Sequence, residues 1–282
     1  MDPLYYLNGK YLPASEAKIS VQDLGWIRGY GVFDYLRTYA KKPFHLDEHL
    51  LRLEYSLQEI GLSLPCLPHE LRDIILTLLE RNNFETSSIK IVVSGGHSLD
   101  HMTSAAPSTL CVMVYPFRPF PERHYEEGIR LMTTSLSRPF PKVKTTCYLP
   151  AILAFKEAES QGFHDALYCH PQGYILETTT SNFFAFVGNT LITPPAEEIL
   201  MGITRSVILN IARPHFSIEE RMISREDIVD FQEAFICSSS KEIMPVVHID
   251  TTAMGNGSVG PLTQKLRILF KAYTQQPSWD PL

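Results

Sequence analysis

The sequence lacks the features of a membrane-spanning, secreted or nucleic-acid-binding protein. No apolar run approaches the roughly 20 residues that a membrane span requires. The N-terminal stretch MDPLYYLNGK has no basic region followed by an apolar one, so no secretory signal is expected. The formal net charge of −6 argues against nucleic acid or an anionic membrane as the main partner.

Cysteine patterns that bind metals or form disulfide frameworks are also missing. The five cysteines are scattered, with no CxxC pair and no cluster of histidine and cysteine at metal-ligand spacing. Reduced thiols are the simplest interpretation, which predicts a cytoplasmic protein without a bound metal.

The length and composition are those of a globular protein with one large domain or two packed domains. The chain has 282 residues, of which 44% are apolar and 20% charged. The segment PFRPFPERH at residues 116–124 is rich in proline, which favours an extended linker that is poor in hydrogen-bond donors. We therefore predict a first domain of residues 1–118 and a second of residues 119–282.

Strands and helices mix in both halves, which predicts a two-domain α/β (mixed α+β) fold. Asn8-Gly9 between apolar residues is typical of a hairpin turn, and so is Gly188-Asn189. Leucines at helical spacing predict a helix over residues 47–60. Further helices are expected over 69–83, 150–161, 203–212 and 264–273, and strands over 32–39, 89–96, 108–117, 129–138, 166–170, 173–177 and 234–239.

Two segments have the composition of an anion-binding site. In GITRSVILNIA, Gly202 precedes a helix whose first turn holds Ile203 and Thr204, and the N–H groups and dipole at such a terminus favour an anion. In FICSSSKEI, three serines at residues 238–240 follow an apolar strand, where ligands often bind. The alternatives are an ordinary helix cap and a polar loop.

Charged residues in three other segments are candidates for chemistry. Arg52 lies at the edge of a leucine stripe, where its guanidinium can bind a phosphate at two points or extend along the surface. Glu177 ends an apolar strand, so it is either a solvated acid or a buried one that needs a cationic partner. Lys142 and Lys144 in KVKTTCYLPAIL are surface charges or a reactive amine.

Together these groups are the set that pyridoxal 5′-phosphate (PLP) requires. The aldehyde of PLP needs a lysine amine. Its ring nitrogen needs an acid that keeps the ring able to accept electrons. Its phosphate needs several N–H, hydroxyl or arginine donors.

Over nearly its whole length the chain resembles the class IV aminotransferases, the fold-type IV PLP enzymes. The resemblance is carried by LNGKYLPASEAKISVQDLGWIRGYGVFDYLRTY, ETTTSNFFAFVGNTLITPP, ILMGITR and EAFICSSSKEIMPV. The family includes branched-chain aminotransferases, D-amino-acid aminotransferases and aminodeoxychorismate lyases. It implies a small N-terminal domain, a larger C-terminal domain that carries the Schiff-base lysine, and a homodimer.

The resemblance also implies roles for individual residues. Lys144 matches the Schiff-base lysine, which makes Lys142 a bystander. Glu177 matches the acid that pairs with the pyridine nitrogen, and Tyr148 a tyrosine near the ring oxygen in some branched-chain members. The residues that it implies around the phosphate are Arg52, Ile203, Thr204, Ser239 and Ser240.

The substrate site departs from each subfamily. D-amino-acid aminotransferases carry an Arg-x-His pair where this chain reads HSLDHM, which has no arginine. Branched-chain enzymes show FEG where Phe33-Asp34-Tyr35 stands, and the lyases have a threonine at the position of Tyr35. The candidates for holding the substrate carboxylate are Arg28, Lys90 and Tyr148, and Tyr35 is a further candidate for binding the substrate. For Arg28 a surface ion pair is the alternative, and for Lys90 a solvated strand residue.

These patterns predict a PLP-dependent aminotransferase that exchanges amino and keto groups between an amino acid, branched-chain L or D, and a 2-oxo acid. One alternative is a lyase on the same scaffold that releases pyruvate from aminodeoxychorismate. The other is a PLP-binding protein without catalytic activity.

Overall fold

The computed structural model describes residues 2–282 and divides them into two compact units. Unit 1 comprises the residues up to Arg118, the segment Val143–Cys147 and Pro281. Unit 2 comprises Pro119–Lys142, Tyr148–Asp280 and Leu282. The sequence-based division assigned Val143–Cys147 to the second domain, whereas the structure groups this segment with unit 1.

Backbone hydrogen bonds explain why Val143–Cys147 belongs to unit 1. The Phe33 N–H donates to the Lys144 carbonyl at 2.9 Å, and the Thr146 N–H donates to the Gly31 carbonyl at 2.9 Å. The segment therefore pairs with the start of a unit 1 strand. A boundary drawn at a proline-rich segment cannot detect a later stretch that returns to the first unit.

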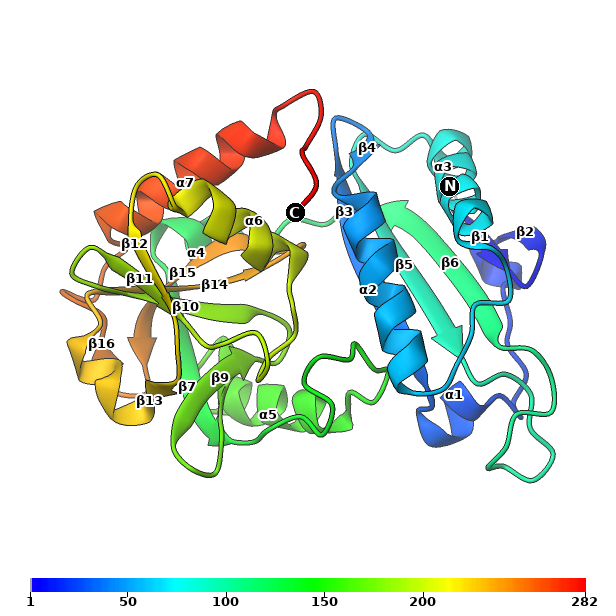
Figure 1. Cartoon of the computed structure of the whole chain (residues 1–282), viewed down its shortest axis with the longest axis horizontal. Helices are drawn as coiled ribbons and strands as arrows, with labels where there is room; N and C mark the ends of the chain where they lie inside the picture. The colour runs from blue at the N-terminus through cyan, green and yellow to red at the C-terminus, as the bar shows by residue number, and fades with distance from the viewer. Residues whose placement is uncertain (1) are drawn as a thin grey trace. The chain divides into compact units, whose positions relative to one another are not determined.

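Unit 1 is built on a six-stranded sheet with the order β2-β1-β6-β5-β3-β4 (Figure 1). All of its neighbouring strands are antiparallel. The predicted hairpin at Asn8-Gly9 is confirmed, and both residues have the positive φ that such a turn favours. The strands are β1 (Leu4–Leu7), β2 (Lys10–Pro13), β3 (Gly31–Tyr39), β4 (Lys42–Pro43), β5 (Ser87–Ser94) and β6 (Thr109–Pro116).

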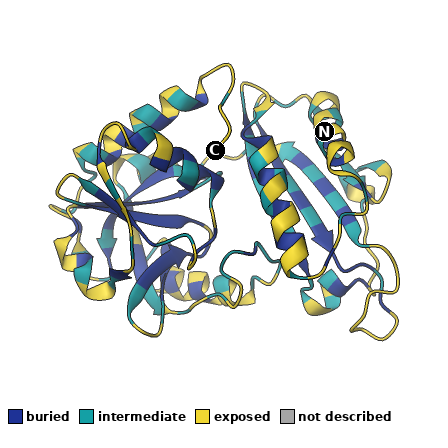
Figure 2. Ribbon diagram, in the orientation of Figure 1, coloured by how far each residue is buried: buried dark blue, intermediate teal, exposed yellow. Residues whose placement is uncertain are grey.

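Two helices, α2 (Leu46–Glu59) and α3 (Pro68–Asn82), cover one face of this sheet. Burial alternates along β3, because Val32 and Leu36 point into the helix-covered core while Phe33 and Tyr35 point to the other face. That second face is only partly buried, as the alternating colours of β5 and β6 in Figure 2 show. The helices expected over 47–60 and 69–83 are thus confirmed.

A short helix of unit 1, α1 (Leu24–Arg28), was not predicted from the sequence. Its five residues are too few to show a helical period. The side chain of Asp23 caps it by accepting from the Gly25 N–H at 2.7 Å. A 3₁₀ turn, η1 (Ala14–Glu16), precedes it.

Unit 2 is built on a ten-stranded sheet with the order β12-β11-β10-β14-β15-β7-β8-β9-β13, and β16 pairs with β15. An additional pairing of β9 with β10 closes the strands from β10 round to β9 into a ring. The strands are β7 (Ile129–Ser135), β8 (Asp165–Cys169), β9 (Tyr174–Thr178), β10 (Asn182–Val187), β11 (Thr190–Thr193), β12 (Ser217–Glu220), β13 (Ile223–Ser224), β14 (Glu233–Ser238), β15 (Glu242–Ile249) and β16 (Thr252–Ala253).

Strands β8, β10 and β14 are buried along almost their whole length, unlike the alternating strands of unit 1 (Figure 2). Such continuous burial requires cover on both faces. The helical elements are α4 (Arg123–Glu126), α5 (Leu149–Ser160), α6 (Ile203–Ala212), η2 (Arg225–Asp230) and α7 (Pro261–Thr274). The segment 116–124, expected to be an extended linker, has no helix or strand over residues 117–121, and the two units divide within it, after Arg118. The segment enters α4 at Arg123. No helix in residues 2–282 is long and apolar enough to cross a membrane.

Candidate functional site

The reactive-lysine candidate Lys144 lies in unit 1, next to the start of β3. Its N–H donates to the Ser56 Oγ at 3.3 Å, and its ammonium lies 4.7 Å from the centroid of the Phe33 ring. The Lys90 ammonium lies 4.9 Å from the same centroid. Two of the sequence-predicted residues, Lys144 and Lys90, are therefore brought together around one aromatic ring.

Arg52, the phosphate-binding candidate of unit 1, is held by the carboxylate of Asp34. The Arg52 Nε and Nη2 each lie 2.9 Å from an oxygen of Asp34, a two-point ion pair inside the helix-covered core. Burial alone raises the pKa of Asp34, but Arg52 and His49 outweigh it and hold that pKa well below its usual range. Asp34 therefore fixes the plane of the guanidinium, while phosphate binding by Arg52 stays a prediction.

His49 completes this group, and one of its ring nitrogens has no hydrogen-bond partner. The Nδ1 lies 2.6 Å from the Asp34 Oδ1, whereas the buried Nε2 is unsatisfied within the described part of the chain. Burial lowers the pKa of His49, and Lys144 is among the nearby charges that lower it further. A neutral imidazole with an orphan nitrogen near Lys144 is the kind of atom that a bound molecule satisfies. We call Phe33, Asp34, His49, Arg52, Lys90 and Lys144 the lysine cluster.

Tyr35 and Lys90 are direct cross-strand neighbours on β3 and β5, on the same face as Phe33. The Tyr35 hydroxyl lies 2.9 Å from the Ser88 Oγ. Burial lowers the pKa of Lys90, and the Cys111 thiol acts in the opposite direction. A half-buried cation beside a phenol is a suitable receptor for a carboxylate.

Arg28, the other cationic candidate, ends α1. Its Nε donates to the His101 carbonyl at 3.1 Å, and its Nη1 to the Ile27 carbonyl at 3.4 Å. None of its hydrogen bonds within residues 2–282 reaches the lysine cluster. The structure therefore brings Lys90 toward Lys144 but not Arg28.

The acid candidate Glu177 lies in unit 2, near the end of β9, and is only 5% exposed. Its Oε1 forms an ion pair with Arg138 and accepts from the Leu200 N–H at 3.2 Å. Its Oε2 accepts from the Asn182 Nδ2 at 3.2 Å. A cation and two N–H donors stabilise the charged carboxylate, so the buried-acid interpretation of Glu177 applies.

The N-terminus of α6 lies against the same group, which we call the carboxylate cluster: Arg138, Glu177, Asn182, Leu200 and Gly202. Asn182 donates to the Leu200 carbonyl at 2.8 Å as well as to Glu177. A β-carbon at Gly202 would overlap the Asn182 side-chain oxygen. Gly202 is the N-cap of α6 without a side-chain cap, so Thr204 is not the cap. The first N–H groups of α6, those of Ile203 and Thr204, have no acceptor within the helix.

We expect Gly202→Ala to weaken both the fold and cofactor affinity, because the added methyl group displaces Asn182 from Glu177. The cost of such overpacking is about 1–3 kcal/mol. Thermal unfolding and PLP titration measure the two effects.

The matched control is Gly260→Ala, where a β-carbon would overlap Glu233 at the N-terminus of α7. This variant should lose stability with unchanged PLP affinity. Equal losses of affinity in the two variants would contradict the role given to Gly202.

Ser239 and Ser240 lie in the loop between β14 and β15, where the paired strands end at Ser238 and Glu242. The Ser240 Oγ is 3.4 Å from the Ser238 Oγ, and the three serines are partly exposed. Hydroxyl groups at a strand end and accessible to solvent are suited to bind an anion.

Tyr148 precedes α5 and is close enough to Tyr168 to affect it electrostatically. The pKa of Tyr168 is raised, mainly by burial and next by the charge of Asp165. Tyr148 and Glu177 raise it further. Tyr148 and Glu177 of the carboxylate cluster are therefore both close enough to Tyr168 to act on its hydroxyl.

Sequence reasoning missed Asp34, His49, Arg138 and Asn182. Arg138 and Glu177 are 39 residues apart, and no local pattern joins them. The one usable signal was that a buried Glu177 requires a cation.

Each cluster, taken by itself, carries groups of the kind that PLP requires. A protonated pyridine nitrogen needs a buried anion, which Glu177 supplies. A phosphate needs N–H and hydroxyl donors, which Ile203, Thr204 and the β14–β15 loop supply. A lysine amine is available at Lys144.

A lysine, a buried acid and a set of anion donors are the groups that PLP-dependent transferases use. The chain belongs to the family described as amino-transferase class IV, whose profile matches residues 31–249. The predicted family, fold class and enzyme class are therefore confirmed.

Relatives and solved structures of aminotransferases cover almost the entire chain. A Methanocaldococcus jannaschii protein proposed to be a branched-chain-amino-acid aminotransferase is 34% identical, over 94% of each chain. The D-alanine aminotransferase of Staphylococcus epidermidis is 30% identical, over 97% of this chain and 98% of its own. The Escherichia coli branched-chain amino acid aminotransferase superimposes with a TM-score of 0.93, at 25% identity over 99% and 98% of the two chains.

A further solved structure carries a form of the cofactor. This branched-chain amino acid aminotransferase, from the organism abbreviated T.th., was solved with pyridoxamine 5′-phosphate. It gives a TM-score of 0.91, at 26% identity over 98% of this chain and 96% of its own. The family is PLP-dependent. The names of these relatives favour the aminotransferase over the lyase alternative.

Proposed function

We propose that this chain binds PLP through Lys144 and Glu177 and transfers the amino group of an apolar amino acid to a 2-oxo acid. The observation that carries the proposal is the burial of Glu177 with Arg138 and two N–H donors. Desolvating two charges offsets most of their attraction, so apolar residues of the same volume would pack here at least as well, and packing alone does not account for this carboxylate.

When bound, PLP supplies an electron sink that makes the Cα–H bond of an amino acid acidic. Glu177 holds a proton on the ring nitrogen by remaining negatively charged. The N–H groups of Ile203 and Thr204, the guanidinium of Arg52 and the hydroxyls of Ser239 and Ser240 bind the phosphate. Together these groups fix the orientation of the ring.

Lys144 has two tasks under this proposal. Its amine would hold the cofactor covalently, and as a free amine it would carry a proton to and from the substrate as general base and acid. The backbone bonds of Lys144 to Phe33 and Ser56 fix the point on unit 1 from which its side chain extends.

Lys90 and Tyr35 bind the substrate carboxylate under this proposal, in place of the missing Arg-x-His pair. The ammonium groups of Lys90 and Lys144 lie 4.9 Å and 4.7 Å from the centroid of the same Phe33 ring, so the two groups are close to each other. The aromatic face around Phe33 suits an apolar side chain. Arg28 remains the alternative, acting at the site of a second subunit.

We expect Lys90→Met to lower kcat/KM for the best amino donor, because a buried carboxylate loses its charged partner. The loss of transition-state stabilisation should be about 2–4 kcal/mol. PLP binding should be preserved. Steady-state kinetics compares this variant with Arg28→Ala. A loss of kcat/KM in Arg28→Ala alone would show that Arg28, and not Lys90, binds the carboxylate.

We further propose that the chain is a homodimer. In unit 2, Leu149, Ile152 and Leu153 form one apolar stripe on α5 and are 65%, 48% and 58% exposed. In unit 1, Trp26 is 70% exposed. Exposed apolar groups of this size are typical of an interface.

Sedimentation should therefore give about twice the chain mass of 32.0 kDa. Leu153→Glu should shift the protein toward monomer, and Leu282→Glu at the end of the chain is the control. A monomer with full activity would contradict the dimer.

An amino-donor screen with L- and D-amino acids and a 2-oxo acid acceptor tests the reaction. We expect transfer from apolar L-amino acids. A D-amino acid donor is the second candidate, favoured by the identity to a D-alanine aminotransferase. Formation of 4-aminobenzoate from aminodeoxychorismate without transfer would support the lyase instead.

A further inference from the structure

Lys241 in the β14–β15 loop is a buried lysine that the proposed reaction does not use. Only 8% of the residue is exposed. Lysine is almost never buried to this extent unless its charge is paired. A buried cation next to a predicted phosphate-binding loop therefore requires an explanation.

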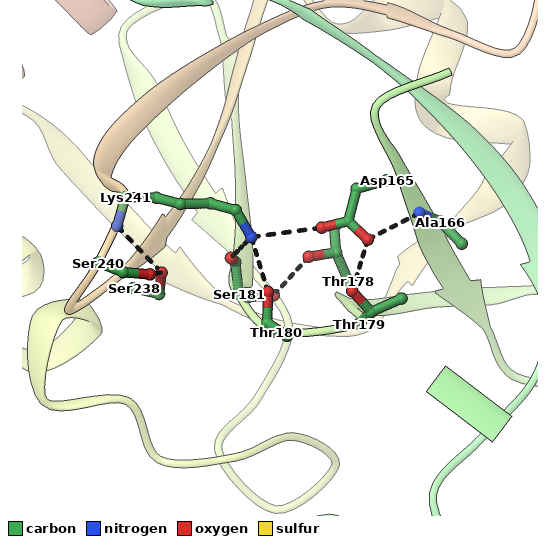
Figure 3. A network of polar contacts seen from close by, with 9 residues as sticks. All are labelled: Asp165, Ala166, Thr178, Thr179, Thr180, Ser181, Ser238, Ser240 and Lys241. Carbon is green, nitrogen blue, oxygen red and sulfur yellow. Dashed lines mark hydrogen bonds and ion pairs between the residues drawn. The ribbon is translucent and has the colours of Figure 1, made fainter. Parts of the chain in front are cut away.

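The Lys241 ammonium is surrounded by acceptors from two other segments (Figure 3). It donates to the Thr180 Oγ1 at 2.7 Å and the Ser181 Oγ at 3.0 Å, and pairs with the Asp165 Oδ2 at 3.4 Å. These acceptors match the three protons of an ammonium group. The other oxygen of Asp165 accepts from the Thr179 Oγ1 at 2.6 Å.

This network links the two loops that carry the predicted cofactor residues of unit 2. Thr179–Ser181 form the turn between β9 and β10, so they lie between Glu177 and Asn182 along the chain. Lys241 itself follows Ser239 and Ser240. We call the loop of residues 239–241 the serine loop. The Lys241 side chain therefore links the serine loop to the turn that follows Glu177.

The serine loop needs such support. Glu242, at its end, has a φ of 54°, which is unfavourable for a residue other than glycine. Loops at strand ends also move more readily than the strands. The Lys241 N–H donates to the Ser238 Oγ at 3.3 Å, so both the backbone and the side chain of Lys241 hold the loop.

We propose that Lys241 is a positioning residue for phosphate binding. It holds the hydroxyls of Ser239 and Ser240 in the geometry that binds the phosphate, and its charge attracts the dianion to this loop. This inference rests on the proposed function. A positioning role predicts that replacing Lys241 weakens the binding of ligands with a phosphate group and not of ligands without one. A general contribution to stability would weaken both.

The test compares two ligands in the full-length chain freed of cofactor. PLP and pyridoxal, which lacks the phosphate, are titrated into the wild type and Lys241→Met. We expect PLP affinity to fall roughly tenfold, the size of one charge-assisted hydrogen bond, while pyridoxal affinity changes less than about twofold.

The matched control is Arg225→Met, which removes another ion pair of unit 2, the one between Arg225 and Asp250. It should leave both affinities unchanged. Lys241→Arg, which keeps the charge, should restore part of the PLP affinity. Equal weakening of both ligands by Lys241→Met, or no weakening, overturns the inference.

A second variant covers the case in which Lys241→Met does not fold. Thr180→Val combined with Ser181→Ala keeps the lysine but removes two of its acceptors, and its outcomes are read in the same way. A wild-type chain that neither binds PLP nor forms an adduct at Lys144 would refute the proposed function itself. Wild-type binding with an unselective Lys241→Met refutes only the inference.

Discussion

Lys144→Ala should lose amino-transfer activity by roughly 10⁴-fold or more, because one side chain supplies both the covalent link and the proton transfer. The carbonyl of residue 144 accepts from the Phe33 N–H of β3, and its N–H donates to the Ser56 hydroxyl of α2. The substitution changes neither backbone group. Folding should therefore be preserved, and the loss should appear in kcat. Steady-state rates with the best donor, together with thermal unfolding, measure both quantities.

Lys142→Ala is the matched control, since Lys142 has the same charge two residues earlier and a similar partial exposure. It should retain activity within a few fold. If Lys142→Ala were inactive and Lys144→Ala active, the assignment of the reactive lysine would be reversed.

Glu177→Gln should lower kcat/KM by roughly 10²- to 10³-fold. The amide retains the shape of the side chain but removes the charge that keeps a proton on the pyridine ring, and it leaves Arg138 without its partner. A loss of roughly 10²- to 10³-fold is typical when one preorganised electrostatic group is removed from an active site. Losing one member of a buried pair also costs about 3–5 kcal/mol of folding stability, so thermal unfolding is measured beside the rate.

Glu177→Asp retains the charge and should recover part of the activity. The absorbance spectrum of the bound cofactor is a second readout, because it responds to protonation of the ring. A Glu177→Gln variant within threefold of the wild type, with an unchanged spectrum, would refute the role of Glu177.

Most regular elements could be predicted from local patterns. The leucine stripe of α2 and the Asn8-Gly9 turn involve only a few neighbouring residues, so the sequence displays them directly. The helix α1 has too few residues to show a period. The strand β13 (Ile223–Ser224) is defined only by its pairing with β9, which no local pattern reveals.

The site could be predicted only as far as single residues carry a family motif. Lys144 and Glu177 match residues with a role in the family, whereas no motif of the sequence assigns a role to His49 or Arg138. Asp34 meets Arg52 because β3 packs under α2, and Arg138 meets Glu177 across 39 residues. Such pairs depend on tertiary packing, which the order of residues does not display.

The segment that carries Lys144 illustrates the same limit. Its order along the chain places it after the proline-rich segment, yet its hydrogen bonds place it with β3. Without knowledge of that pairing, the proximity of Lys90 to Lys144 around Phe33 could not be foreseen. For this reason we propose Lys90 rather than Arg28 as the residue that binds the substrate carboxylate.

Borohydride reduction of the wild-type protein loaded with PLP, followed by peptide mapping by mass spectrometry, tests the central claim most directly. Reduction fixes the covalent link between the cofactor and the amine that holds it. The account predicts a single pyridoxyl group on Lys144, and none in Lys144→Ala. A pyridoxyl group on Lys142 or on another lysine, or no adduct in a protein that binds PLP, would contradict it.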